Sequence, residues 1–143
     1  MNVPDSRILC IDDDTNTSRW IRIMLKGSKV NAEVVTVKTG REAFIRLNEE
    51  EFDLCILEYA LPDMTGVQLC SLIRQMGCNL PILFFTAMNR PVDREMAEVA
   101  GASNYLCKPD DLDLFVATVT NLLKIHRPVY GQNIGFVTLP KAA

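Results

Sequence analysis

Side chains able to do chemistry follow the apolar runs of this chain. They are three consecutive acids after the first run, a glutamate after the third, a threonine closing the fourth and a lysine after the fifth: Asp12, Asp13, Asp14, Glu58, Thr86 and Lys108. Close carboxylates repel one another and raise each other's pKa unless a cation compensates. A hard ion such as Mg²⁺, held by one or two carboxylates and water, is the natural solution. Lys108 and the Thr86 hydroxyl would then face phosphoryl oxygens presented at the site.

Each of these features is ordinary by itself. An acidic run usually makes a solvated loop and a helix cap, and a threonine at a strand end is common. Their order is informative, because every one of them follows a predicted strand. Ligands of an open parallel sheet bind beyond the carboxyl ends of its strands. The fold would therefore bring these side chains together at one edge.

Two periodicities alternate along the chain and predict the elements that carry these side chains. Continuous apolar runs, typical of strands buried on both faces, occupy 8–11, 34–37, 54–57, 81–86 and 103–107. Apolar residues between them recur at helical spacing, most clearly from Leu112 to Leu123. The alternation predicts five strand–helix pairs and a doubly wound α/β fold, with helices on both faces of a parallel sheet.

The chain has the length of one domain, 143 residues. We expect a domain over 1–125, followed by a tail or linker over 126–143, where Pro128, Gly131, Gly135 and Pro140 interrupt any long helix. A formal charge of −3 argues against a nucleic-acid footprint. No signal peptide or membrane-length apolar stretch is present, so the cytoplasm is the expected location.

Five cysteines occur without a CxxC pair, and the single histidine lies far from them. These residues predict buried free thiols rather than a zinc site or disulfides.

Four segments together resemble the receiver domains of two-component response regulators, the CheY-like family. They are Asp12-Asp13, Leu57-Glu-Tyr-Ala-Leu-Pro-Asp-Met-Thr-Gly66, Phe84-Phe-Thr-Ala87 and Tyr105-Leu-Cys-Lys-Pro109. The resemblance runs from about Arg7 to Ile125, nearly the whole chain. It implies a flavodoxin-like (βα)5 fold with five parallel strands in the order 2-1-3-4-5.

The resemblance also implies a role for each matching residue. Asp12 and Asp13, with the Ala60 carbonyl and the acceptor-position carboxylate, would hold Mg²⁺. Lys108 would contact the phosphoryl group, together with Thr86. Thr86 and Tyr105 would form the switch: in such domains the hydroxyl moves toward the phosphoryl group and the aromatic ring turns inward. The surface around the fourth and fifth helices then changes its choice of partner.

The family's phospho-acceptor is an aspartate, whereas the matching residue here is Glu58. The extra methylene moves the carboxylate by ~1.5 Å. Phosphoryl transfer depends on positioning, and an error of ~1 Å can cost on the order of 100-fold in rate. We therefore predict that Glu58 is not phosphorylated efficiently. Three hypotheses remain open: a constitutive mimic of the phosphorylated state, an inert pocket with a Lys108–Glu58 ion pair, and slow phosphorylation of Glu58.

The predicted function is non-enzymatic: a signalling switch whose partner is another signalling protein, a histidine kinase or an output protein. Homodimerisation through the fourth helix, fifth strand and fifth helix is a family expectation, with Arg94, Glu98, Asp111 and Asp113 as the residues to watch.

A haloacid-dehalogenase-like phosphatase would also use an Asp-x-Asp pair, here Asp12 and Asp14. That family needs Gly-Thr after the second aspartate, where this chain has Thr15-Asn16, and the chain leaves no room for a cap domain. Direct DNA binding is not expected, because nothing after Ile125 suits a recognition helix.

Overall fold

The computed structural model describes residues 3–125, which form one parallel sheet of five strands in the order β2-β1-β3-β4-β5. The elements are β1 (Ser6–Ile11), α1 (Thr15–Lys26), β2 (Ala32–Val37), α2 (Gly40–Glu49), β3 (Leu54–Leu57), α3 (Gly66–Gln75), β4 (Ile82–Thr86), α4 (Pro91–Ala100), β5 (Asn104–Cys107), the short 3₁₀ helix η1 (Leu112–Leu114) and α5 (Phe115–Ile125). The predicted fold class and strand order are confirmed.

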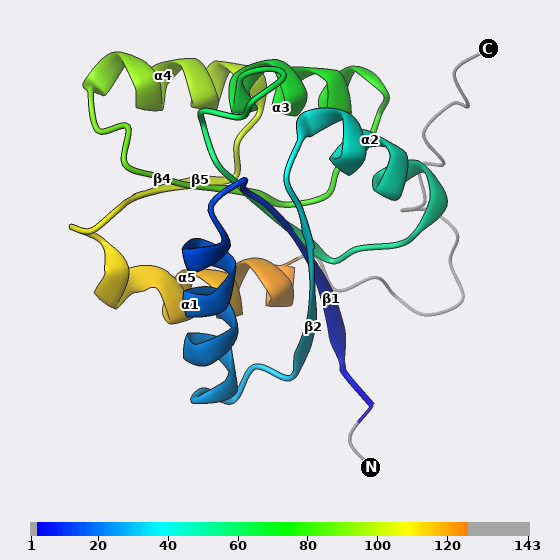
Figure 1. Cartoon of the computed structure of the whole chain (residues 1–143), viewed down its shortest axis with the longest axis vertical. Helices are drawn as coiled ribbons and strands as arrows, with labels where there is room; N and C mark the ends of the chain where they lie inside the picture. The colour runs from blue at the N-terminus through cyan, green and yellow to red at the C-terminus, as the bar shows by residue number, and fades with distance from the viewer. Residues whose placement is uncertain (1–2, 126–143) are drawn as a thin grey trace.

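The helices form two layers, with α2, α3 and α4 on one face of the sheet and α1 and α5 on the other (Figure 1). Successive strand residues alternate between these layers. In β1, Leu9 and Ile11 pack on the side of α2 and α3, while Ile8 and Cys10 pack toward α1 and α5. All four are at most 1% exposed, which explains why this strand is a continuous apolar run.

Helix ends follow the residues that the sequence offers for them. Asp14 caps α1 by accepting from the Asn16 N–H at 2.9 Å, and Thr65 caps α3 in a reciprocal box with Gln68. Gly101 ends α4 at φ 111°, a left-handed conformation that glycine adopts without strain.

The apolar residues of α4 face outward. Val92, Met96 and Val99, whose spacing predicts this helix, are 48%, 49% and 84% exposed. The helix instead buries Asp93 and Ala97 against its neighbours. Asp93 tolerates this position because Arg90 bonds to its carboxylate at 2.8 Å and 3.0 Å. The spacing of apolar residues therefore identifies the helix. Its core face, however, carries Ala97 and the ion-paired Asp93.

All five cysteines are free, as predicted, and Cys10, Cys55, Cys70 and Cys107 are buried, whereas Cys78 is only partly buried. Burial raises the pKa of the Cys10 thiol to about 12, so it behaves as a small hydrophobe. No helix within residues 3–125 has the length and apolarity to cross a bilayer. The predicted tail, 126–143, lies outside the described residues.

Candidate functional site

The ammonium of Lys108 lies at the centre of the residues that the sequence brings to the carboxyl edge of the sheet. Its Nζ is 3.1 Å from Glu58 Oε2, 3.1 Å from Thr17 Oγ1 and 3.4 Å from Asp12 Oδ2. A lysine ammonium has three N–H donors, and these three contacts use all of them. Lys108 thus links β5 to the ends of β1 and β3 and to the first turn of α1.

Glu58 follows β3 directly, and its two carboxylate oxygens have different partners. Oε2 faces Lys108, while Oε1 accepts from the Tyr59 N–H at 2.7 Å and from the hydroxyl of Thr86 in a short hydrogen bond. The Ala60 N–H adds a longer contact of 3.4 Å to Oε1. The carboxylate is therefore held between the backbone of its own loop, the end of β4 and the end of β5.

Asp12 is the buried acid of the cluster, and Asp13 is exposed. Asp12 Oδ1 accepts from the Asp14 N–H at 2.9 Å. Burial raises the pKa of Asp12, although the Asp14 N–H and the Lys108 ammonium oppose that change. The cluster therefore retains an energetically costly carboxylate with one cation to compensate it.

Side chains that could hold a metal ion do not converge here. Within residues 3–125, no three Asp, Glu, His or Cys side chains are grouped as metal ligands. The Lys108 ammonium lies between the two inward carboxylates, 3.4 Å from Asp12 Oδ2 and 3.1 Å from Glu58 Oε2. This donor arrangement is an ammonium-bridged carboxylate pair. The predicted metal ligands Asp12, Asp13, Glu58 and the Ala60 carbonyl remain a prediction.

The hydroxyl of Thr86 connects Glu58 to Tyr105 through one residue of the β4–α4 loop. Thr86 Oγ1 accepts from the Met88 N–H at 3.2 Å, and the Met88 carbonyl accepts from the Tyr105 hydroxyl at 2.6 Å. The Tyr105 side chain is directed inward, with only 3% of the residue exposed, and its ring stacks on Phe84 at 5.7 Å. Burial raises the pKa of Tyr105, so its hydroxyl remains a donor.

Gly66 allows the loop after β3 to fold back on Glu58. Its N–H donates to the Tyr59 carbonyl at 2.6 Å. A Cβ at this position would lie 3.0 Å from the Phe84 ring and 3.1 Å from the Tyr59 Cα, and closer still to the Glu58 carbonyl oxygen. Only glycine, which has no Cβ, lets the backbone come this close to its neighbours. Asp63, in the same loop, points elsewhere and caps α2 through the N–H groups of Gly40 and Arg41, both at 2.9 Å.

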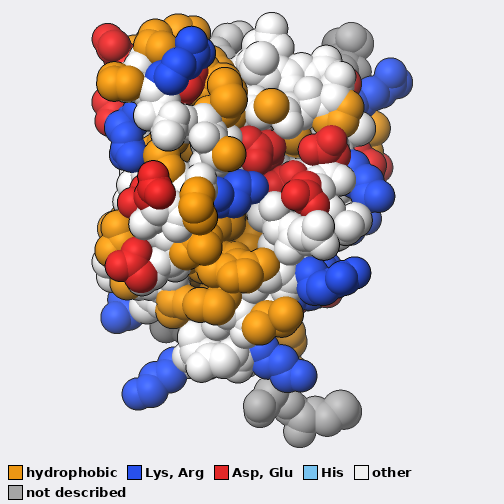
Figure 2. Space-filling view, turned by 60° about the vertical axis from the view of Figure 1, so that its left-hand side comes forward, with side chains coloured by type: hydrophobic (Ala, Val, Ile, Leu, Met, Phe, Trp, Pro, Cys, Tyr) orange, Lys and Arg blue, Asp and Glu red, His pale blue; other side chains and the backbone are white. Residues whose placement is uncertain are grey.

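A hydrophobic cavity of about 270 Å³ adjoins Lys108. Trp20, Phe85, Pro109 and Leu112 line it, and Trp20 stacks on Phe85 with ring centroids 5.5 Å apart. On this face of the molecule, a basic side chain lies beside acidic ones, with a broad hydrophobic area next to it (Figure 2). Thr17, which sequence reasoning missed, contacts Lys108 from the first turn of α1; its place just after the acidic run was the available signal.

Comparisons with known proteins agree on one family. The model of the response regulator receiver domain matches residues 8–120. The transcriptional regulatory protein PcoR of Escherichia coli is 33% identical over 121 residues, which cover 85% of this chain and 53% of PcoR. The response regulator RppA of Synechocystis is 35% identical over 105 residues, 72% of this chain and 44% of RppA. The chain thus spans about half the length of these curated relatives.

Solved structures show the same architecture. A two-component response regulator from Clostridium difficile superposes with a TM-score of 0.77 at 27% identity, covering 87% of this chain and 100% of that one. The beryllofluoride-activated receiver domain of DrrB superposes with a TM-score of 0.73 at 25% identity, covering 83% of this chain and 97% of that one. With the family model matched over most of the described residues, this chain belongs to the response regulator receiver domain family.

Proposed function

We propose that this receiver is a protein-interaction switch that Glu58, in the acceptor position, holds in its signalling arrangement without phosphorylation. The observation that carries the proposal is the hydrogen bond from the Thr86 hydroxyl to Glu58, together with the buried position of Tyr105. The family resemblance implies this pair of positions for a phosphorylated receiver. Here a carboxylate of the chain itself supplies the acceptor oxygen.

The reach of Glu58 accounts for this substitution. Its Oε1 contacts Thr86 and its Oε2 contacts Lys108, the two side chains expected to meet phosphoryl oxygens. A carboxylate carries one negative charge, against about −1.5 to −2 for a phosphate group. Glu58 therefore mimics phosphate in position and sign of charge, with a smaller charge and fewer oxygens.

The two other hypotheses account for less of this geometry. An inert pocket requires only the Lys108–Glu58 ion pair and leaves the Thr86 contact without a role. Slow phosphorylation requires Glu58 to act as a nucleophile. Its Oε1 accepts hydrogen bonds from the Tyr59 N–H and the Thr86 hydroxyl and its Oε2 accepts from Lys108, and these contacts make both oxygens weaker nucleophiles. A phosphatase reaction has no support in the comparisons.

Receiver domains generally bind Mg²⁺, and we propose that Lys108 takes over its neutralising role in this chain. The ammonium pairs with both Asp12 and Glu58. Binding of Mg²⁺ by the predicted ligands would require Lys108 to move from between them. One positive charge against two carboxylates leaves the cluster anionic, which is tolerable because Glu58 and Lys108 are partly exposed.

The partner of this switch is expected to be another signalling protein, a histidine kinase or an output protein. Dimerisation over α4, β5 and α5 remains a prediction. Two of the residues predicted for that surface have structural roles: Arg94 contacts Tyr105, and Asp111 accepts from the Cys107 N–H at 2.8 Å. Glu98 and Asp113 are the charged residues left to act in such an interface.

The test compares wild type with Glu58→Asp and Glu58→Gln. Trp20, the single tryptophan, shares a cavity with Lys108 and reports on the pocket by fluorescence. We expect no saturable response of the wild type to Mg²⁺ with beryllofluoride, and a clear response of Glu58→Asp. Glu58→Gln keeps the side-chain length and removes the charge, and should expose the Tyr105 ring. A wild type that responds like Glu58→Asp, or a Tyr105 ring unchanged in Glu58→Gln, would contradict the proposal.

A further inference from the structure

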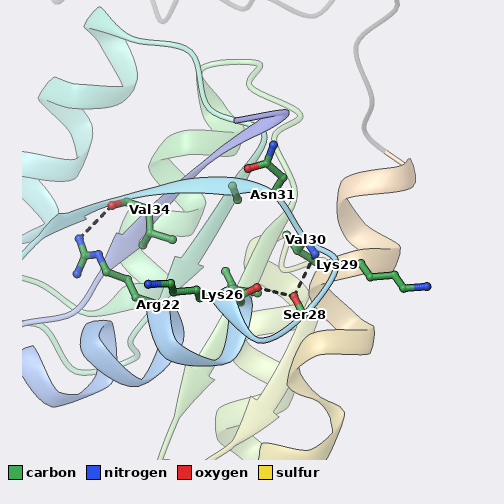
Figure 3. Close-up of a pocket in the computed structure, with 9 residues that line it drawn as sticks. Arg22, Lys26, Ser28, Lys29, Val30, Asn31 and Val34 are labelled. Carbon is green, nitrogen blue, oxygen red and sulfur yellow. Dashed lines mark hydrogen bonds between the residues drawn. The ribbon is translucent and has the colours of Figure 1, made fainter. Parts of the chain in front are cut away.

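A cavity of about 600 Å³ lies at the far end of α1 from the Glu58 cluster, between the last turns of that helix, the loop 27–31 and the start of β2 (Figure 3). Its lining includes Arg22, Lys26 and Lys29 and no acidic residue. The lining thus carries three positive charges in a chain whose net charge is −3.

None of these three cations forms an ion pair with another side chain of residues 3–125. Lys26 lies in the last turn of α1, where the negative end of the helix dipole stabilises its positive charge. One of the three charges thus has a partner in the helix itself. Arg22 and Lys26 are four residues apart, and like charges at this helical spacing repel each other. Their repulsion would be relieved by an anion between them.

The guanidinium of Arg22 lies at the β2 side of the cavity (Figure 3). Its Nη2 donates to the Val34 carbonyl at 3.0 Å, which fixes the side chain against β2 and leaves four of its five N–H donors for other acceptors. Figure 3 shows the Lys26 side chain next to it and Lys29 on the other side of the loop. Arg22 offers a planar fork of donors and Lys26 a point charge, and both kinds of group donate hydrogen bonds to phosphate oxygens.

The neutral part of the lining indicates what accompanies the anion. Leu25, Val30 and Val34 supply an apolar floor beneath the cations. The hydroxyl of Ser28 is occupied, since it donates to the Leu25 carbonyl and accepts from the Val30 N–H. The cavity volume falls in the range of about 300–1,000 Å³ that is usual for small-molecule sites.

We propose that this cavity binds a small phosphate-bearing anion through Arg22 and Lys26, with Lys29 at the rim. The ligand is either a free multivalent phosphate or an organic phosphate ester whose neutral part rests on the apolar floor. The proposal is independent of the function assigned to Glu58, because no lining residue belongs to that cluster.

The test uses the whole chain in calorimetric titrations at fixed ionic strength, with pyrophosphate and adenosine diphosphate as probes. The variant Arg22→Gln/Lys26→Gln removes the proposed ligands. The control Arg19→Gln/Lys38→Gln removes the same charge from two exposed residues outside the cavity. We expect saturable 1:1 binding that weakens at least about tenfold in the first variant and less than about twofold in the control.

The two probes separate the sources of the phosphate. Tighter binding of adenosine diphosphate indicates an ester that uses the apolar floor, and equal binding indicates a free phosphate chain. The proposal is overturned if neither probe saturates, or if the control variant loses as much affinity as the first. Amide chemical shifts that change around Glu58 rather than around 22–34 would overturn it as well.

Discussion

The guanidinium of Arg94 lies over the ring of Tyr105, with its central carbon 4.9 Å from the ring centroid. Its Nη1 also donates to the Tyr105 carbonyl at 3.2 Å. Phe84 stacks on Tyr105 with an interplanar angle of 13°. The ring of the predicted switch residue is thus held by α4 and β4 together. This contact connects the Glu58 cluster to the helix whose outer face is apolar and exposed.

Substituting Arg94 is expected to loosen the inward position of Tyr105. A cation–π contact of this kind is worth about 0.5–1 kcal/mol at an exposed site. Arg94→Gln removes it, and Arg94→Lys keeps the charge without the planar group. We expect both variants to increase solvent access to the Tyr105 ring, measured by ¹⁹F NMR of fluorotyrosine-labelled protein with Tyr105→Phe for assignment. Glu98→Gln, on the same helix, is the control; an equal shift in Glu98→Gln would show that Arg94 has no special role.

Removing the central ammonium is expected to destabilise the domain. In Lys108→Met, Asp12 and Glu58 lose their shared partner. Charged hydrogen bonds contribute about 1.5–3 kcal/mol, and partial exposure places the expected loss at the lower end. Urea unfolding measures it. The double variant Lys108→Met/Glu58→Gln should recover part of the loss, and additive single effects would mean that the two side chains are not coupled.

A methyl group at position 66 is expected to displace the Glu58 loop. The added Cβ of Gly66→Ala would approach the Glu58 carbonyl, the Phe84 ring and the Tyr59 Cα. Overpacking of this kind costs about 1–3 kcal/mol. We expect lower stability in urea unfolding and altered amide shifts at Tyr59 and Ala60. Gly27→Ala is the matched control, because its Cβ would meet only backbone oxygens at 3.6 and 3.8 Å. Wild-type stability in Gly66→Ala would show that the loop has room to spare.

The alternation of apolar runs with helical spacing was enough to predict five strand–helix pairs in a parallel sheet, while the strand order was implied by the resemblance to receiver domains. The strands are buried on both faces, so their signal is continuous and needs no knowledge of partners. The outward face of α4 could not be predicted, because Asp93 is buried only through its pairing with Arg90. A pairing of that kind depends on side-chain geometry rather than on the order of residues.

The site was predicted as a set of residue types, while its connections were not. Strand ends placed Asp12, Glu58, Thr86 and Lys108 together, as expected for a parallel sheet. Thr17 lies on a helix, and no sequence motif predicts its contact with Lys108. The division of the Glu58 oxygens between Thr86 and Lys108 depends on torsion angles that the sequence does not specify.

The buried carboxylate of Asp12 is expected to make stability fall as pH rises. Burial places the pKa of Asp12 in the folded state above its ordinary value of 3.8. The folded state therefore binds a proton more tightly than the unfolded state. Stability from this group is fully present below the unfolded pKa and is lost as pH rises through the folded pKa.

Comparison of wild type with Asp12→Asn isolates this contribution. The asparagine keeps an oxygen for the Asp14 N–H and does not titrate, so Asp12→Asn should gain stability relative to wild type as pH rises from about 4 to 7. One unit of pKa change corresponds to ~1.4 kcal/mol, which sets the scale of the gain. Urea unfolding at several pH values measures it, with Asp13→Asn, at an exposed carboxylate, as the control. A difference between Asp12→Asn and wild type that stays constant or shrinks with pH would mean that the Lys108 ammonium fully compensates the buried charge.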